Sequence, residues 1–106
     1  MTYHQLGSVT VGMVETAGLD VAQVVTQVTA ALDEDLAYGP DVTTEATVPA
    51  GQSVEAVVAA RRGGILAGLP VALVAIDLVI GAGQWGLLEH RDDGSVLSPG
   101  DHALRL

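Results

Sequence analysis

The feature that most constrains the fold is a helix that must end within residues 32–50 and be followed by extended chain. The stretch reads Leu-Asp-Glu-Asp-Leu-Ala-Tyr-Gly-Pro-Asp-Val-Thr-Thr-Glu-Ala-Thr-Val-Pro-Ala, in which Gly39 and Pro40 end the helix. The three acids at positions 33–35 fall in the last helical turn, where the negative end of the helix dipole disfavours them. They therefore indicate either a solvated acidic surface or a junction specific to one protein family.

Two amphipathic helices are predicted. In the first, Asp20 is a capping residue, and apolar side chains recur at spacings of three and four from Val21 to Leu36. In the second, Pro70 suits the first turn, and Gly81 and Gly83 terminate the helix. The inner face of the second helix is predicted to contain Val71, Val74, Ala75, Leu78 and Val79.

The rest of the chain is predicted to form strands. Residues 53–61 and 84–90 read as strands, residues 92–95 as a turn, and Leu104 and Leu106 as core positions of a final strand. Residues 1–18 read as an N-terminal extension, either a short edge strand or a mobile tail, before a domain at 19–106. Because helices and strands do not alternate regularly, we expect an α+β fold with a mostly antiparallel sheet packed with two main helices.

The charge balance excludes several functions. Thirteen acids face four arginines, there is no lysine, and the formal net charge is −9. We therefore expect no nucleic-acid partner, because phosphate neutralisation needs a basic surface. The apolar run at 65–80 is too short to span a membrane and contains Asp77, so we expect it to be a core helix. No cation precedes Arg61, which argues against a secretory leader and favours a cytoplasmic location.

Several motifs do not support catalysis. Residues 81–86 match G-x-G-x-x-G, but a strand and turn follow where a dinucleotide site needs a helix. Without cysteine there is no thiolate or disulfide, and the three histidines lack metal-ligand spacing. Residues 93–101 resemble the hairpin of biotinyl and lipoyl carriers, which require a lysine that this chain lacks. Asp77 is interpreted as a solvent-side residue or as a buried partner of an arginine.

Four motifs, in residues 34–44, in 46–49, in 60–61 with 64–69, and in 93–101, together resemble the N-terminal domain of quinolinate phosphoribosyltransferase (nicotinate-nucleotide diphosphorylase, carboxylating). Arg62 departs from the pattern, because many members have glutamate there. The resemblance implies an α/β-hammerhead domain that precedes a catalytic α/β barrel. It also implies a reaction of quinolinate with phosphoribosyl pyrophosphate, which gives nicotinate mononucleotide, CO2 and pyrophosphate for NAD synthesis.

In that family the substrate-binding side chains lie in or beside the barrel, so the resemblance predicts no catalytic, substrate-binding or metal-binding residue in this chain. Mg²⁺ is expected only for the full enzyme. The domain would cover the barrel of a partner subunit in a homodimer or larger oligomer, and the 106 residues alone would be inactive. The predicted interface residues are Arg61, Gly63, Gly64 and Gly68.

Two alternatives stay open at this point. One is a related pentosyltransferase of the molybdenum-transport-associated type, which only residues of the barrel would distinguish. The other is a stand-alone interaction module without enzymatic activity. Both keep the same α+β expectation for the chain itself.

Overall fold

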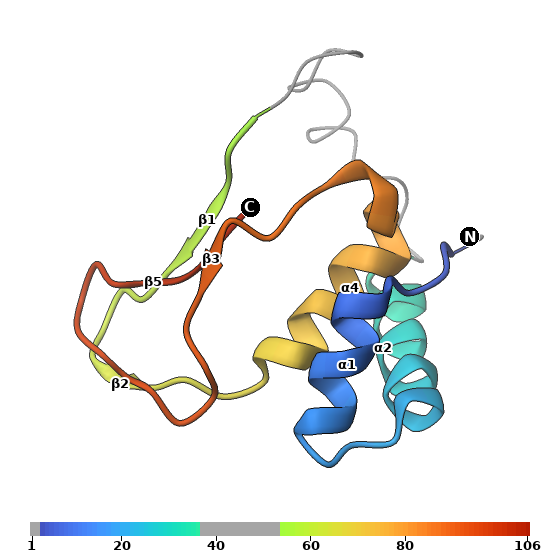
Figure 1. Cartoon of the computed structure of the whole chain (residues 1–106), viewed down its shortest axis with the longest axis horizontal. Helices are drawn as coiled ribbons and strands as arrows, with labels where there is room; N and C mark the ends of the chain where they lie inside the picture. Colours follow the sequence, from blue (N-terminus) through green and yellow to red (C-terminus); the bar gives the residue numbers. More distant parts are fainter. Residues whose placement is uncertain (1–2, 37–53) are drawn as a thin grey trace.

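A computed structural model describes residues 3–36 and 54–106 of the chain (Figure 1). Most of the stretch at 32–50, including the predicted helix stop at Gly39 and Pro40, lies outside these residues. The described elements are α1 (Ser8–Thr16), α2 (Val21–Leu36), β1 (Val57–Ala59), β2 (Gly64–Ile65), α4 (Leu69–Ile80), the 3-10 turn η1 (Ala82–Gln84), β3 (Glu89–His90), β4 (Val96–Leu97) and β5 (His102–Arg105).

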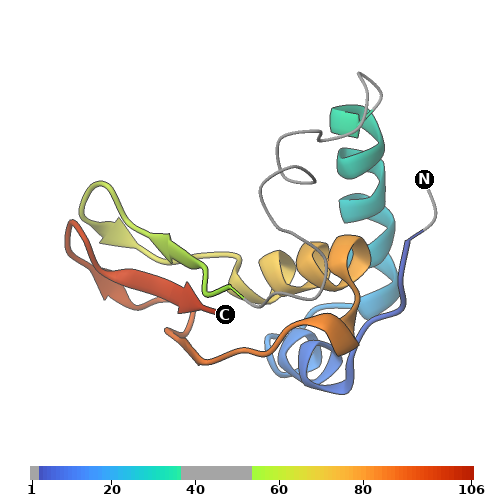
Figure 2. The same ribbon diagram turned by 90° about the horizontal axis from the view of Figure 1, so that it is seen from above.

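The fold is α+β, as predicted. Helices α1, α2 and α4 pack together, and the strands form two small antiparallel sheets beside them, one in the order β1-β5-β3 and one pairing β2 with β4. Figure 2 shows the strands and their connecting loops extending away from the helices, with α4 between the strands and α2. The helices therefore make one layer of the domain, and the strands make a lobe at its side.

Helix α4 is central because two of its faces are buried. Val74 and Leu78 pack with Val14 of α1 and Val24 of α2, whereas Leu69 and Leu73 pack with Leu104 of β5. The spacing of four within each pair places each on one helical face. The predicted inner face was thus only one of the two buried faces of α4. Val79, which was predicted to lie on it, is 39% exposed.

For the N-terminal region, the alternative of a short edge strand was wrong, since residues 8–16 form the helix α1. The alternating Val9, Val11 and Met13 suggested an edge strand, but Thr10 and Val14 are the buried positions and are spaced by four, as in a helix. Gly18 has φ +79°, a left-handed conformation that favours glycine, and the chain turns there into α2.

Helix α2 begins as predicted. The Asp20 Oδ1 accepts a hydrogen bond from the Gln23 backbone N–H at 3.1 Å, which satisfies one of the amide groups left free at a helix start. Its valine stripe packs against the core of the helices, as the periodicity indicated. Near the other end of α2, the Tyr3 hydroxyl donates to Asp33 Oδ1 at 2.5 Å, so one of the three acids holds the N-terminal segment.

The strands are shorter than predicted. β1 covers only Val57–Ala59 of the expected 53–61, and β3 covers only Glu89–His90 of the expected 84–90. The final strand is confirmed, with Leu104 2% exposed and Leu106 packed against the same cluster. The register of β1 on β5 shifts between Val58 and Ala59, which limits the ladder to a few residues.

Candidate functional site

Three of the four predicted interface residues lie together. Arg61 and Gly63 occupy the bend between β1 and β2, Gly64 begins β2, and all three are exposed. Gly68 lies apart from them, at the start of α4. A side chain added at Gly64 would meet no atom within 4 Å, so the fold itself does not demand glycine at that position.

An exposed aliphatic pair follows this bend, which sequence reasoning missed. Ile65 of β2 lies opposite Val96 of β4, and they are 72% and 74% exposed. Directly opposed residues share one face of an antiparallel ladder. On the other face Leu97 is only 7% exposed, so the ribbon has one covered and one open face. Ile65 was predicted to belong to a core helix, and that prediction was wrong because the helix begins at Leu69.

We call the surface formed by Arg61, Arg62, Ile65 and Val96 the hairpin face. Neither arginine of the hairpin face forms an ion pair with any other residue in the described ranges. The surface therefore combines two aliphatic side chains with positive charge on a strongly anionic chain. Sequence reasoning found Arg61 through the family motif, but the strand register that pairs Ile65 with Val96 was needed to complete the surface.

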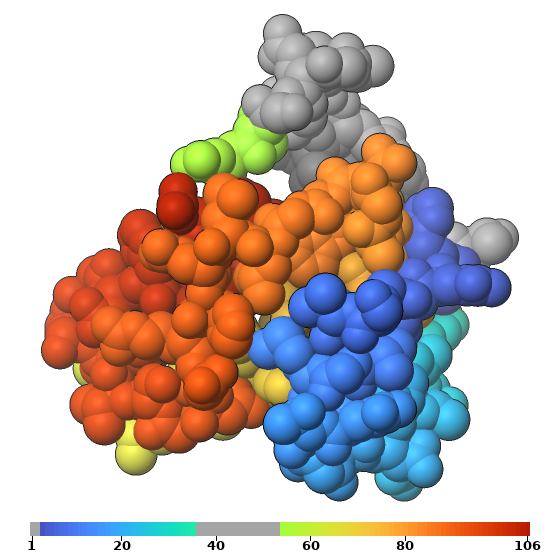
Figure 3. Space-filling model, viewed as in Figure 1, coloured from blue at the N-terminus to red at the C-terminus, as the bar shows by residue number. Residues whose placement is uncertain are grey.

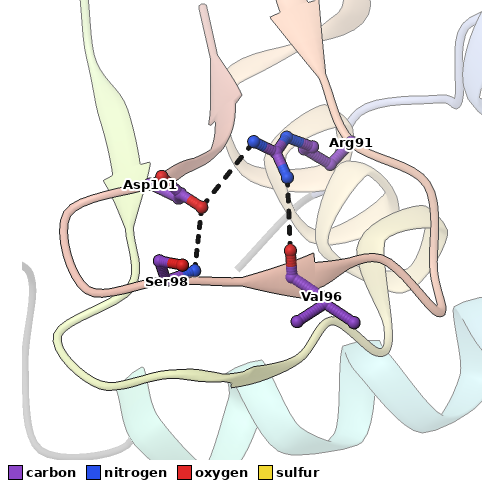
Figure 4. Close-up of polar contacts among 4 residues, drawn as sticks. All are labelled: Arg91, Val96, Ser98 and Asp101. Carbon is purple, nitrogen blue, oxygen red and sulfur yellow. Dashed lines mark hydrogen bonds and ion pairs between the residues drawn. The ribbon is translucent and has the colours of Figure 1, made fainter.

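The other two arginines stabilise the strands. Arg91 Nη2 lies 3.7 Å from Asp101 Oδ2, and Arg91 Nη1 donates to the Val96 carbonyl at 3.3 Å (Figure 4). The same Asp101 oxygen accepts from the Ser98 N–H at 2.8 Å, which closes the turn between β4 and β5. These contacts hold the segment from β4 to β5, which carries Val96.

Arg105 makes a second ion-pair group on β5. Its guanidinium lies 3.4 Å from Glu55 and 3.6 Å from Glu89, so it joins carboxylates from both sides of the strand. Because these pairs are exposed, each contributes little to stability. Their effect here is to neutralise the positive charge of Arg105. Among the described residues, the remaining unpaired positive charge of the strand lobe therefore lies at the bend of the hairpin face.

The predicted interface residue Gly68 has a structural role. Its φ of +86° lies in the left-handed region, and its N–H donates to Asp93 Oδ2 at 3.1 Å. The N–H of Leu69 donates to the other carboxylate oxygen of Asp93 at 2.9 Å. Asp93, in the turn before β4, thus caps α4 from a distant part of the sequence, which ties the helix to the strand lobe.

Asp77 is buried, at 1% exposure, but not through either predicted arrangement. Its Oδ2 accepts from the Gly7 N–H at 2.9 Å, and its Oδ1 accepts from the Trp85 Nε1–H at 2.8 Å. The carboxylate therefore joins the start of α1 to the segment after α4 through these two donors, and neither of them is an arginine. The prediction of a solvent-side position was wrong because α4 is covered on more than one side.

Two adjoining hollows lie between α1 and residues 85–93. Their volumes are about 430 and 530 Å³, and both are lined by Ser8, Val9 and His90. Figure 3 shows the hollow between the blue surface of α1 and the orange segment, with the yellow start of α4 at its floor. We call this concavity the α1 groove.

The described residues offer no cluster for metal or nucleotide chemistry. In residues 3–36 and 54–106, no three histidine or acidic side chains converge on one point. The glycine-rich motif at 81–86 contains η1 and an extended Trp85, and it is followed by β3 and a turn, as predicted, so no helix N-terminus faces a phosphate there. Within the same residues, no helix has the length and apolar character required to cross a bilayer.

Taken together, the fold and the hairpin face define an α+β domain in which a helical layer carries a lobe of short antiparallel strands. Over 74 residues the chain is 45% identical to the nicotinate-nucleotide pyrophosphorylase [carboxylating] of Mycobacterium leprae (strain TN), a match that covers 70% of this chain. It covers 26% of that relative, so the chain is related to about a quarter of the enzyme. No protein-family model matches the chain.

This similarity confirms the resemblance drawn from the sequence motifs. The matched share of the relative has the size of a domain, and it is consistent with the N-terminal domain of a quinolinate phosphoribosyltransferase.

Proposed function

We propose that this chain serves as the N-terminal domain of an enzyme that makes nicotinate mononucleotide from quinolinate and phosphoribosyl pyrophosphate. In this proposal the domain covers the active site of a partner subunit, and the catalytic groups come from a barrel elsewhere in the assembly. The 45% identity to part of a nicotinate-nucleotide pyrophosphorylase carries the proposal.

The charges of the chain support a non-catalytic role. Quinolinate has two carboxylates and the second substrate is a polyphosphate, so an active site for them needs several cations. Arg91 and Arg105 are already paired with acids, and the described residues contain only two further arginines, Arg61 and Arg62. We therefore expect no turnover by the 106 residues alone.

The described residues do not fit the expected Mg²⁺ either. Magnesium prefers octahedral oxygen ligands and is commonly held by carboxylates together with substrate phosphates. No three acidic or histidine side chains converge in residues 3–36 and 54–106. In the proposed enzyme, Mg²⁺ would be held outside this part of the chain.

The hairpin face is the surface that we assign to the partner subunit. Ile65 and Val96 expose most of their side chains, and contact with a partner would remove this apolar area from water. Arg61 and Arg62 would meet acidic groups of the partner. A domain held there would exclude water from the neighbouring active site and help to shape it.

A complementation assay tests this role. The chain is mixed with the Mycobacterium leprae enzyme from which the matching quarter has been deleted, and nicotinate mononucleotide formation is measured with quinolinate, phosphoribosyl pyrophosphate and Mg²⁺. We expect neither piece to be active alone and the mixture to be active. Activity of the chain by itself, or a mixture that neither binds nor reacts, would overturn the proposal.

Matched variants locate the contact in the same assay. Ile65→Ser with Val96→Ser should abolish complementation without unfolding the chain, because both side chains are exposed. Leu19→Ser removes a less exposed aliphatic side chain, 43% accessible, from the turn between α1 and α2, and should leave complementation unchanged. Equal effects of the two changes would exclude the hairpin face as the contact.

A further inference from the structure

We propose that the α1 groove is a docking site for a basic amphipathic helix of a partner protein. The groove lies between α1 and residues 85–93, and its lining shares no residue with the hairpin face. This second contact is independent of the enzymatic role proposed above.

The floor and one wall of the groove are apolar. Val9 of α1 is 64% exposed, and Met13 contributes to the same wall. Leu69 and Pro70, at the start of α4, form the floor of the larger hollow. An apolar side chain inserted here would leave water and would also cover Val9, which nothing in the described residues covers.

The opposite wall is acidic. Asp92 has a side chain that is 87% exposed and lines the larger hollow together with Asp93, which also caps α4. Glu89 lines the other hollow, where it is 55% exposed and paired with Arg105. Neither hollow is lined by any arginine, and His90 is the one lining side chain that could carry a positive charge. With an apolar floor beside an acidic wall, the groove complements a segment that has aliphatic residues on one face and lysine or arginine at its edge.

The form of the groove favours a helix over an extended segment. One wall is the helix α1, and the larger hollow is lined by residues of α1, the start of α4 and residues 90–93. The edge strand β3 lines the groove but offers a free edge of only two residues, too short to pair the backbone of an extended segment, whereas a helix satisfies its own. Nine residues of α1 extend about 13 Å, which is two to three turns of a partner helix.

Trp85 provides a direct test, because this single tryptophan of the chain lines the groove. The probe is a synthetic peptide of about 15 residues, capped at both ends, with leucine on one helical face and lysine on the other. We expect saturable binding with a change in Trp85 fluorescence. A peptide with glutamate in place of lysine should bind at least about tenfold more weakly.

Two variants test the shape of the groove. Gly12→Leu should weaken binding at least about tenfold, because a side chain at Gly12 projects into open space in the groove and meets no atom of the chain. Gly64→Leu is the matched control, since a side chain there is equally unobstructed but lies in β2, outside the lining of the groove. Circular dichroism should show both variants folded.

A second pair tests the charge. Asp92→Asn should weaken binding of the basic peptide by roughly two- to fivefold, which is the effect expected from the loss of one exposed ion pair. Glu34→Gln makes the same change in net charge on α2 and should have a smaller effect. Equal binding of the basic and acidic peptides, no binding of either, or unchanged affinity of Gly12→Leu would each overturn the proposal.

Discussion

The indole of Trp85 donates its N–H to the buried carboxylate of Asp77 at 2.8 Å, and the same carboxylate accepts from the Gly7 N–H. Three segments far apart in sequence therefore meet at one side chain: the start of α1, the middle of α4 and the chain after η1. Asp77 holds the two sides of the α1 groove in place.

Asp77→Ala is expected to destabilise the chain strongly. It leaves the Gly7 and Trp85 donors without their acceptor, at a cost of about 1–3 kcal/mol for each donor that stays buried and unpaired. Chemical denaturation gives the change in the free energy of unfolding, and Trp85 fluorescence should shift to the red. Asp92→Ala removes an exposed acid and should change stability by no more than about 0.5 kcal/mol. Equal losses would contradict the role of Asp77.

Asp93→Ala should destabilise α4 although position 93 lies outside the helix. The substitution removes the acceptor of the Gly68 and Leu69 N–H groups, and loss of a helix cap costs about 0.5–2 kcal/mol. Hydrogen exchange at the first turn of α4 should accelerate more than exchange at the start of α2. If both helix starts respond alike, the substitution acts globally and this role for Asp93 is wrong.

The phenol of Tyr3 should titrate at unusually high pH. Its hydrogen bond to Asp33 raises the pKa of Tyr3 to about 12, from 10.0, because ionisation would break the bond and place two negative charges together. The folded state therefore holds this proton more tightly. The associated stability is present below about pH 10 and is lost as the pH rises through about 12.

Ultraviolet titration of the phenolate measures this pKa. A Tyr38→Phe background leaves Tyr3 as the remaining tyrosine, since the chain has two. Asp33→Asn should lower the Tyr3 pKa, whereas Asp35→Asn, an exposed neighbour in the same turn, should change it less. A Tyr3 pKa near 10 in the parent chain would contradict the hydrogen bond.

Replacing glycine with alanine should change stability differently at two of the predicted interface positions. Gly68→Ala forces a side chain into a left-handed conformation at a cost of roughly 1–2 kcal/mol. Gly64→Ala should be neutral or slightly stabilising, because its new methyl group meets no atom within 4 Å. Thermal unfolding of the two variants checks the difference, and equal midpoints would show that the Gly68 backbone can relax.

Local signals in the sequence predicted the helices at α2 and α4, because Asp20, Pro70 and the valine and leucine spacings act within one segment. The fold class followed from their order. The α1 helix was missed because Val9, Val11 and Met13 alternate as in a strand, whereas the decisive spacing was that of Thr10 and Val14.

The parts of the site that sequence reasoning missed depend on long-range geometry. Asp93 caps a helix that begins 24 residues earlier, and the pairing of Ile65 with Val96 follows from the register of β2 on β4. No periodicity within one segment contains either relationship. Arg61 and the neighbouring glycines were identified through a family motif, and their place in an interface remains a prediction.

The open face of the β2–β4 ribbon has a practical consequence for handling the isolated chain. Ile65 and Val96 attract any apolar surface, and mutual repulsion from a net charge of −9 opposes contact between copies. Near the isoelectric point, about pH 4.3, this repulsion vanishes while the apolar pair stays in place. Acidified solutions should therefore turn cloudy first, and replacing the two aliphatic side chains with serine should keep them clear.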